Sequence, residues 1–182
     1  MENAGRKSVA KKIAMLGILA GLGLVAFLIE SLIPVPFLPG AKLGFANIFS
    51  LLALLLYGLP EALAVVIVRT VLGSLFAGNI SMLLYSLTAG VLSTCLSRLM
   101  LCALPHISFL CVSVAGAIVH NLVQLFVYCA MTGTMLLFVY SPYLCLMGAG
   151  AGIAVGLAVT CLLKALPARM FARQTLPKED IK

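Results

Sequence analysis

Long apolar stretches alternate with short polar, proline- or glycine-containing connections along most of this chain of 182 residues. A helix that crosses a bilayer needs about 20 mainly apolar residues, because each residue adds about 1.5 Å. The pattern therefore predicts six membrane helices, at about 13–33, 43–57, 61–76, 81–104, 107–131 and 142–166. The second and third are short, which is typical of tilted or partly inserted helices. We expect an all-α integral membrane protein, a six-transmembrane-helix bundle.

Composition and charge agree with this interpretation and orient the bundle. Hydrophobic residues make up 63% of the chain and charged residues only 9%, whereas soluble domains carry about 25% charged residues. The net charge of +7 comes mainly from the two ends. Basic residues beside membrane segments mark the cytoplasmic side, so both termini are expected there and nucleic acid is a poor partner. We expect a basic cytoplasmic segment at 1–12, the membrane domain at 13–166 and a cytoplasmic tail at 167–182.

The six cysteines indicate neither a metal site nor a disulfide framework. No two have the C-x-x-C spacing, and all lie in or beside apolar stretches. Single cysteines in such positions act as small apolar packing residues. The sequence therefore predicts no metal and no cofactor.

The segment from Glu30 to Asn47 contains chemistry that a simple connection between membrane helices does not need. Pro34, Pro36 and Pro39 fix φ and remove backbone donors, which predicts a shaped loop. The same segment carries an acid, a lysine, an amide and glycines. With both termini in the cytoplasm, this loop faces the outside.

Polar residues at membrane depth are few, and they are expected to meet in the outer half of the bundle. A charge near the bilayer centre costs about 2.5–3.5 kcal/mol, so each one needs a partner or a function. On the fifth helix, Gly116, His120 and Gln124 form one stripe. The predicted substrate-binding residues come from four helices and their loops, and they are Glu30, Lys42, Asn47, Arg69, Asn79, His120, Asn121 and Gln124.

Two of the three charges in this set are positive, which favours a pocket for an anionic or strongly polar ligand. The alternative is a Glu30–Arg69 ion pair that, with amide hydrogen bonds, only holds helices together.

Rows of small residues let helices approach closely in lipid. Gly17 and Gly21 form one such row, and Gly148, Gly152 and Gly156 form another. These rows predict packing within the bundle or docking onto another membrane subunit.

Three motifs resemble the Gx transporter family, often labelled heptaprenyl diphosphate synthase component I. They are P-G-A-K-L-G-F-A-N at 39–47, Arg69 followed by Gly78, and G-A-I-V-H-N-L-V-Q at 116–124. That family is similar to the S components of energy-coupling-factor (ECF) transporters, six-helix subunits that bind a vitamin-like solute from outside. In those transporters a cytoplasmic ATPase pair acts through a shared membrane coupling protein. The resemblance implies that Gly17 and Gly21 occupy the position of the partner-docking row, which is Ala-x-x-x-Ala in S components.

Catalysis by this chain alone is not expected. Prenyl chain elongation ionises an allylic diphosphate with Mg²⁺ held by clustered aspartates, whereas this chain has one aspartate, Asp180 in the tail. No serine or cysteine has a local His and acid arrangement, and there is no Walker loop. We therefore expect a binding or transport subunit and no enzyme.

The leading hypothesis is a multi-pass protein of the bacterial inner membrane, of S-component type, that captures a small polar or anionic solute from outside. Its partners would be membrane lipid, the coupling protein and the ATPases. The second hypothesis is a non-catalytic accessory subunit of a polyprenyl diphosphate synthase or quinone pathway, with a synthase subunit as partner. A third is a structural role in a membrane redox assembly.

Overall fold

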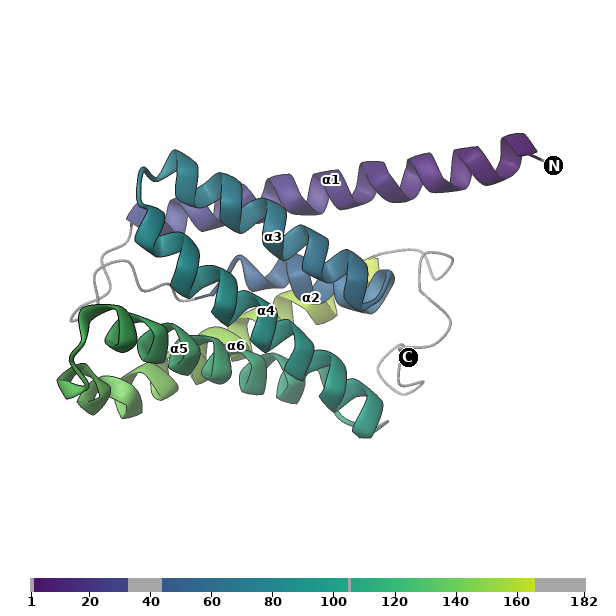
Figure 1. Ribbon diagram of the computed structural model, residues 1–182. Helices are drawn as coiled ribbons and strands as arrows, with labels where there is room; N and C mark the ends of the chain where they lie inside the picture. The colour runs from purple at the N-terminus through teal and green to yellow at the C-terminus, as the bar shows by residue number, and fades with distance from the viewer. Residues whose placement is uncertain (1, 33–43, 105, 166–182) are drawn as a thin grey trace.

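The computed structural model describes residues 2–32, 44–104 and 106–165, with side chains from Val9 onward. These residues form helices and connections and contain no strand. The elements are α1 Glu2–Leu32, α2 Asn47–Leu56, α3 Leu59–Phe76, α4 Ile80–Ala103, α5 Phe109–Thr132, the 3₁₀ helix η1 Leu136–Tyr140 and α6 Ser141–Ala165. Figure 1 shows them as one bundle, past which the N-terminal part of α1 projects. Residues 2–12 of the expected basic segment are therefore part of the first helix.

Five stretches of the described chain are long and apolar enough to cross a membrane, as judged by length and composition. They comprise most of α1, all of α3, α4 and α5, and η1 together with α6. The sixth apolar helix, α2, has only 10 residues, so it is about 15 Å long and reaches half of a bilayer core. The all-α class is confirmed, whereas six spanning helices and the cytoplasmic position of the termini remain predictions.

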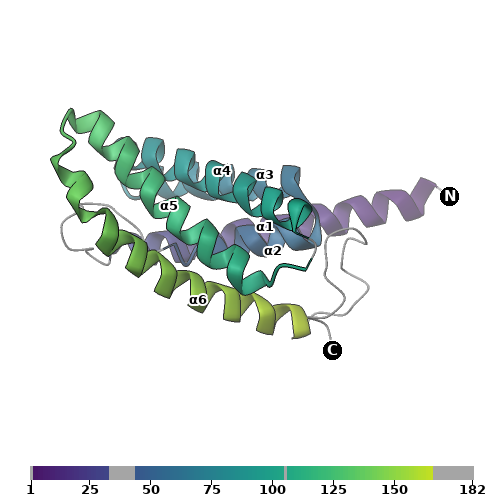
Figure 2. The ribbon, with the colours of Figure 1, turned by 90° about the horizontal axis from the view of Figure 1, so that it is seen from below.

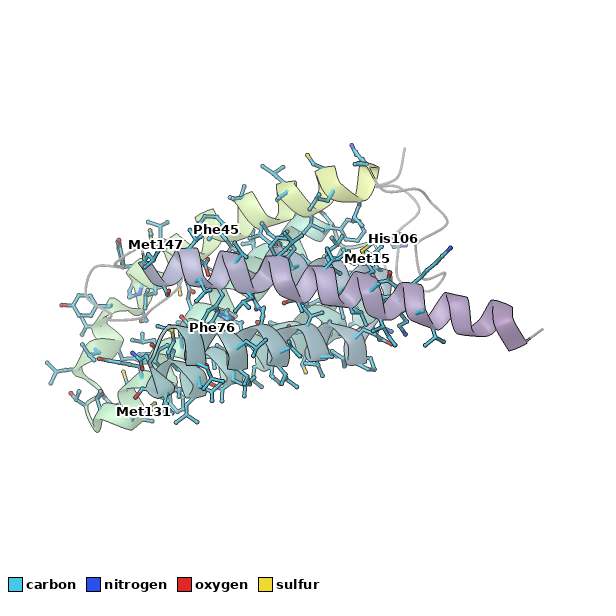
Figure 3. The ribbon with its side chains drawn as sticks, turned by 90° about the horizontal axis from the view of Figure 1, so that it is seen from above. Met15, Phe45, Phe76, His106, Met131 and Met147 are labelled. Atoms are coloured by element: carbon cyan, nitrogen blue, oxygen red, sulfur yellow. The ribbon has the colours of Figure 1, made fainter. Side chains whose placement is uncertain are left out.

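The ends of α2 and α3 follow from local sequence. Gly58 has a φ of +110°, which a residue with a Cβ rarely adopts, and α2 ends just before it. Pro60 lies in the first turn of α3, where its missing N–H costs nothing. In Figure 3, Phe76 and Met131 lie toward one end of the bundle and His106 toward the other, so the long helices alternate in direction.

The helices α1 and α3 run in the same direction and pack together beyond the projecting N-terminal part of α1. Lys12 pairs with Glu61 in the first turn of α3, and the Lys12 ammonium lies 5.8 Å from the ring centroid of Tyr57. Further along, the Phe27 ring fills the space beside Gly73, where an added Cβ would lie 2.2 Å from the ring. A larger residue at position 73 would therefore separate the two helices.

The glycine row of α6 packs against α5 within the chain. A Cβ at Gly152 would lie 2.6 Å from the Cα of Val114, and one at Gly156 would lie 3.0 Å from the Cα of Leu110. The two helices lie side by side in Figure 2. Gly17 and Gly21 on α1 differ, because no atom among the described residues would lie within 4 Å of a Cβ there. Docking at those two positions remains a prediction.

The close approach of α5 and α6 predicts a sharp difference between neighbouring glycines of α6. We expect Gly152→Ala to lower the free energy of unfolding by about 1–3 kcal/mol, because its methyl group meets backbone that has no room to move. Gly150→Ala is the matched control, since nothing lies within 4 Å of a Cβ there, and it should leave stability unchanged or slightly raised. Thermal unfolding in detergent, followed by circular dichroism, measures both. An equal loss of stability in Gly152→Ala and Gly150→Ala would contradict the close packing of α6 on α5.

Candidate functional site

The start of α2 lies inside the bundle, at the depth of the middle of α3. The preceding turn is made by Gly44, with a φ of +93°, and by a backbone hydrogen bond of 2.9 Å from Asn47 N to Gly44 O. Glu30 at the end of α1 accepts a hydrogen bond from the Phe45 backbone N–H. The helix has no side-chain cap. A half-length helix thus directs the positive end of its dipole into the interior, as broken helices do in transporters.

Arg69 on α3 brings a full positive charge to the same place. Its side chain is only 3% exposed, and its Nη2 donates to Asn47 Oδ1 at 2.7 Å. Gly23 leaves room for it, because a Cβ there would lie 3.1 Å from Arg69 Cδ. The Glu30 carboxylate acts on this charge electrostatically. The Nε of Arg69 is buried and has no hydrogen-bond partner in the described part of the chain.

A small cavity lies against these groups, and we call it the arginine pocket. It lies among α1, α2, α3, α4 and α5. Its lining residues are Phe27, Glu30, Gly44, Ala46, Asn47, Arg69, Thr70, Ser86 and His120. A buried arginine and a helix N-terminus facing one acid suit an anion that can accept several hydrogen bonds.

His120 and Gln124 connect this pocket to a polar seam between α4 and α5. Gln124 Nε2 lies 3.2 Å from His120 Nε2 and 3.4 Å from Ser86 Oγ, and His120 Nδ1 lies 3.4 Å from Ser93 Oγ. An amide nitrogen donates, so this arrangement assigns the proton of a neutral imidazole to Nδ1. The seam therefore fixes the orientation of the ring at the pocket wall.

A second cavity lies on the other side of the same turn and beside this seam, and we call it the hydroxyl chamber. Gly44 and Asn47 line both cavities. The other lining residues come from α2, α4, α5 and α6 and are Ser50, Leu51, Leu54, Ser93, Thr94, Ser97, Ser113, Gly116, Ala117 and Val155.

The structure brings together about half of the residues that the sequence singled out. Glu30, Asn47, Arg69 and His120 line the arginine pocket, and Gln124 contacts His120 beside it. These residues come from four separate helices, which is the convergence expected. Whether they bind a ligand remains a prediction.

Two of the predicted residues are placed differently, and a third is not described. Asn79 does not line either cavity, because it is exposed at the start of α4, where its side chain accepts a hydrogen bond from Met82 N at 3.1 Å. Asn121 turns toward α6 and donates to Leu144 O at 3.0 Å. Lys42 lies outside the described residues.

Sequence reasoning missed the hydroxyl groups of α4 and α2. Ser86, Ser93 and Ser97 recur at helical spacing and face α5, so a periodicity search for small polar residues could have found them. Ser50 carries no comparable pattern. Its place in the chamber wall becomes evident only from the structure, because α2 begins inside the bundle.

Five stretches long and apolar enough to cross a membrane, with a partly polar cavity among the helices, are typical of a multi-pass membrane protein. The family described as heptaprenyl diphosphate synthase component I matches residues 19–162, and the chain belongs to this family. The match includes every described residue that lines the two cavities, and it confirms the family named from the sequence. Searches of the curated proteins and of the solved structures found no match.

The buried charges predict that Glu30 matters more for stability than an acid at the bundle edge. Glu30 is 4% exposed, so Glu30→Gln removes charge compensation from Arg69 and should cost about 1–3 kcal/mol of unfolding free energy. Glu30→Ala should cost more, because the Phe45 N–H loses this acceptor. Glu61→Gln, in the more exposed pair with Lys12, should stay within about 1 kcal/mol. Chemical unfolding in micelles tests this order, which a larger loss for Glu61→Gln would contradict.

Proposed function

We propose that this chain is a non-catalytic membrane subunit of a polyprenyl diphosphate synthase, in the bacterial inner membrane, and that it binds a small anionic ligand in the arginine pocket. The observation that carries the proposal is the guanidinium of Arg69, which is buried beside the start of α2 with its Nε unpartnered among the described residues. A buried charge with an unpaired donor is unfavourable unless a negatively charged acceptor binds to it. A phosphate or diphosphate oxygen is a strong acceptor of this kind.

The balance of charges in the arginine pocket supports an anion as the ligand. Arg69 and the α2 dipole are positive, while Glu30 is the one acid among the described lining residues. The acid already accepts the Phe45 N–H, so it stabilises the turn as well as the arginine. The description of the family points to the same chemistry, because prenyl transfer consumes and releases diphosphates. Lys42 would add a second positive charge from the loop.

We assign ligand binding to this chain and catalysis to a partner subunit, and the reason is the side chains that this chain offers to metal ions. Ionisation of an allylic diphosphate uses Mg²⁺ held by several carboxylates. Among the described residues no three His, Cys, Asp or Glu side chains come together. We therefore assign the chemistry to a partner subunit rich in aspartate, with this chain holding the substrate or product at the membrane.

A second candidate is solute uptake by a subunit of S-component type. It is favoured by the position of the pocket at the tip of a half-length helix, where transporters bind substrates. It also gives a role to Gly17 and Gly21, whose face of α1 is open within the described chain and could pack against a coupling protein. ATPases would then drive transport.

The role of Arg69 is tested by binding of inorganic diphosphate to the purified full chain in detergent. Because one or two charge-assisted hydrogen bonds are lost, we expect Arg69→Gln to weaken binding by about 10- to 100-fold. Arg98→Gln is the matched control, since Arg98 is half-buried on α4 and lines neither cavity. Isothermal titration calorimetry measures both. Unchanged binding by Arg69→Gln would overturn the anion site.

Co-expression of the tagged chain with defined partner subunits tests the choice between the two candidate functions. We expect the tagged chain to recover a polyprenyl synthase subunit of the same organism and to change the rate or chain length of its product, measured by chromatography. Recovery of a coupling protein with ATPases, together with uptake of solute into proteoliposomes, would favour transport. Gly17→Leu with Gly21→Leu should abolish that second complex only.

A further inference from the structure

We propose that an anion bound in the arginine pocket takes up a proton from solution, and that the imidazole of His120 carries this proton. The pocket then holds a phosphate-bearing ligand more tightly at acidic pH and releases it as the pH rises. This inference rests on the proposed function and adds to it the condition under which the ligand is held.

The first step is the balance of charge in the pocket. The charged side chains among its described lining residues are Arg69 and Glu30, which cancel each other, and the N-terminus of α2 adds about half a positive charge. A phosphate group carries a charge of about −1.5 to −2 at neutral pH, and a diphosphate group carries more. With a neutral imidazole, the occupied pocket therefore has an excess of about one negative charge or more. Such an excess is unfavourable in a buried site, and an added proton offsets it.

The second step is the position of His120. Its side chain is 5% exposed, and it lines the same pocket as Arg69 and Glu30. Imidazole is the side chain that ordinarily changes its charge between about pH 5 and pH 8. The neutral ring adds no second positive charge beside Arg69, whereas the protonated ring supplies one when an anion is present. His120 is thus placed to follow the charge of the ligand.

The third step is that the partners of the ring suit both of its protonation states. Ser93 Oγ donates to Gly90 O at 3.1 Å, so it acts as an acceptor toward His120 Nδ1, which lies 3.4 Å away. The Gln124 amide lies 3.2 Å from His120 Nε2, and an amide can offer its N–H to a neutral ring or, after rotation, its oxygen to a protonated one. Ser86 Oγ, at 3.4 Å from that amide, can donate or accept in either case. A proton on Nε2 therefore requires the rotation of one amide.

The fourth step is a comparison with the other groups around the ring. The helix α6 has no charged residue before Lys164, near its end. The residues that line the pocket or face the ring from the remaining helices are Glu30 on α1, Asn47 on α2, Arg69 on α3, and Ser86 and Ser93 on α4. Among these described groups only Glu30 competes with His120 for the proton.

Glu30 is the less suitable proton carrier because its carboxylate already has two tasks. It accepts the Phe45 N–H and compensates the charge of Arg69. A proton on Glu30 would weaken both interactions, and the turn before α2 depends on the first. A proton on His120 weakens neither of them and adds a positive charge at the pocket wall. The structure therefore assigns the proton to the imidazole.

The chain has only two histidines, so nuclear magnetic resonance can observe this proton directly. The full chain, labelled at the histidine ring nitrogens and purified in detergent, is titrated with inorganic diphosphate at about pH 7.5, where an ordinary imidazole is mostly neutral. We expect the His120 nitrogens to change from the neutral to the protonated pattern as binding saturates. His106→Gln removes the signal of the exposed second histidine and so assigns the other. A His120 ring that stays neutral at saturation, or is protonated before diphosphate is added, would overturn the inference.

Calorimetry counts the same proton. Heats of diphosphate binding in two buffers of different ionisation enthalpy give the number of protons taken up. We expect the parent chain to take up about one proton more than His120→Gln, and its dissociation constant to rise by up to about tenfold per pH unit more steeply than that of the variant above neutral pH. His106→Gln is the matched control and should behave as the parent chain. Equal proton uptake by the parent chain and His120→Gln, or loss of the uptake only in Glu30→Gln, would contradict the assignment.

Failure of the proposed function gives a different result. If inorganic diphosphate does not bind the parent chain, the anion site is overturned together with this inference. If it binds the parent chain and binding is weakened in Arg69→Gln, but no proton goes to His120, only this inference is overturned. Thermal unfolding of His120→Gln shows whether that variant keeps its fold, and the resonance titration of the parent chain decides the matter if it does not.

Discussion

The burial of one guanidinium group, that of Arg69, constrains much of the surrounding structure. A charge at this depth is unfavourable by several kcal/mol unless the protein supplies counter-charge and hydrogen-bond acceptors. Asn47 supplies an acceptor and Glu30 a negative charge. Gly23 leaves the space that the side chain occupies. The contacts among α1, α2 and α3 at this level are therefore arranged around a single side chain.

The half-length of α2 follows from the same constraint. A helix that continued through the bundle would place its own side chains where the arginine pocket lies. The chain instead reaches the interior as a turn at Gly44, held by the carboxylate of Glu30 through the Phe45 N–H. Buried irregular backbone is tolerated in a membrane protein only where protein or a cavity satisfies it. The cavity is thus a consequence of how the arginine is accommodated.

Sequence patterns predicted the long helices well and the cavity only in part. The helices α3, α4 and α5 begin and end within two residues of the expected limits, because apolar length is a strong signal. The sequence identified the charged residues at membrane depth, because each such charge is energetically unfavourable in lipid. The serines of α4 were missed, because a hydroxyl that bonds a carbonyl of its own helix adds little cost and leaves no mark in hydropathy. Asn79 was misplaced because an N-cap and a pocket amide look alike in sequence.

The two cavities differ in chemistry in a way that orients whatever they hold. The arginine pocket combines a cation, an anion and a helix N-terminus, whereas the described lining of the hydroxyl chamber has hydroxyl groups and aliphatic side chains but no charge. A ligand with one charged end has only one favourable direction across the Gly44–Asn47 turn, because reversal would bury its charge among serines and leucines. Under the proposed function, this asymmetry would fix the direction in which the chain holds its ligand. It follows from one buried arginine and one short helix.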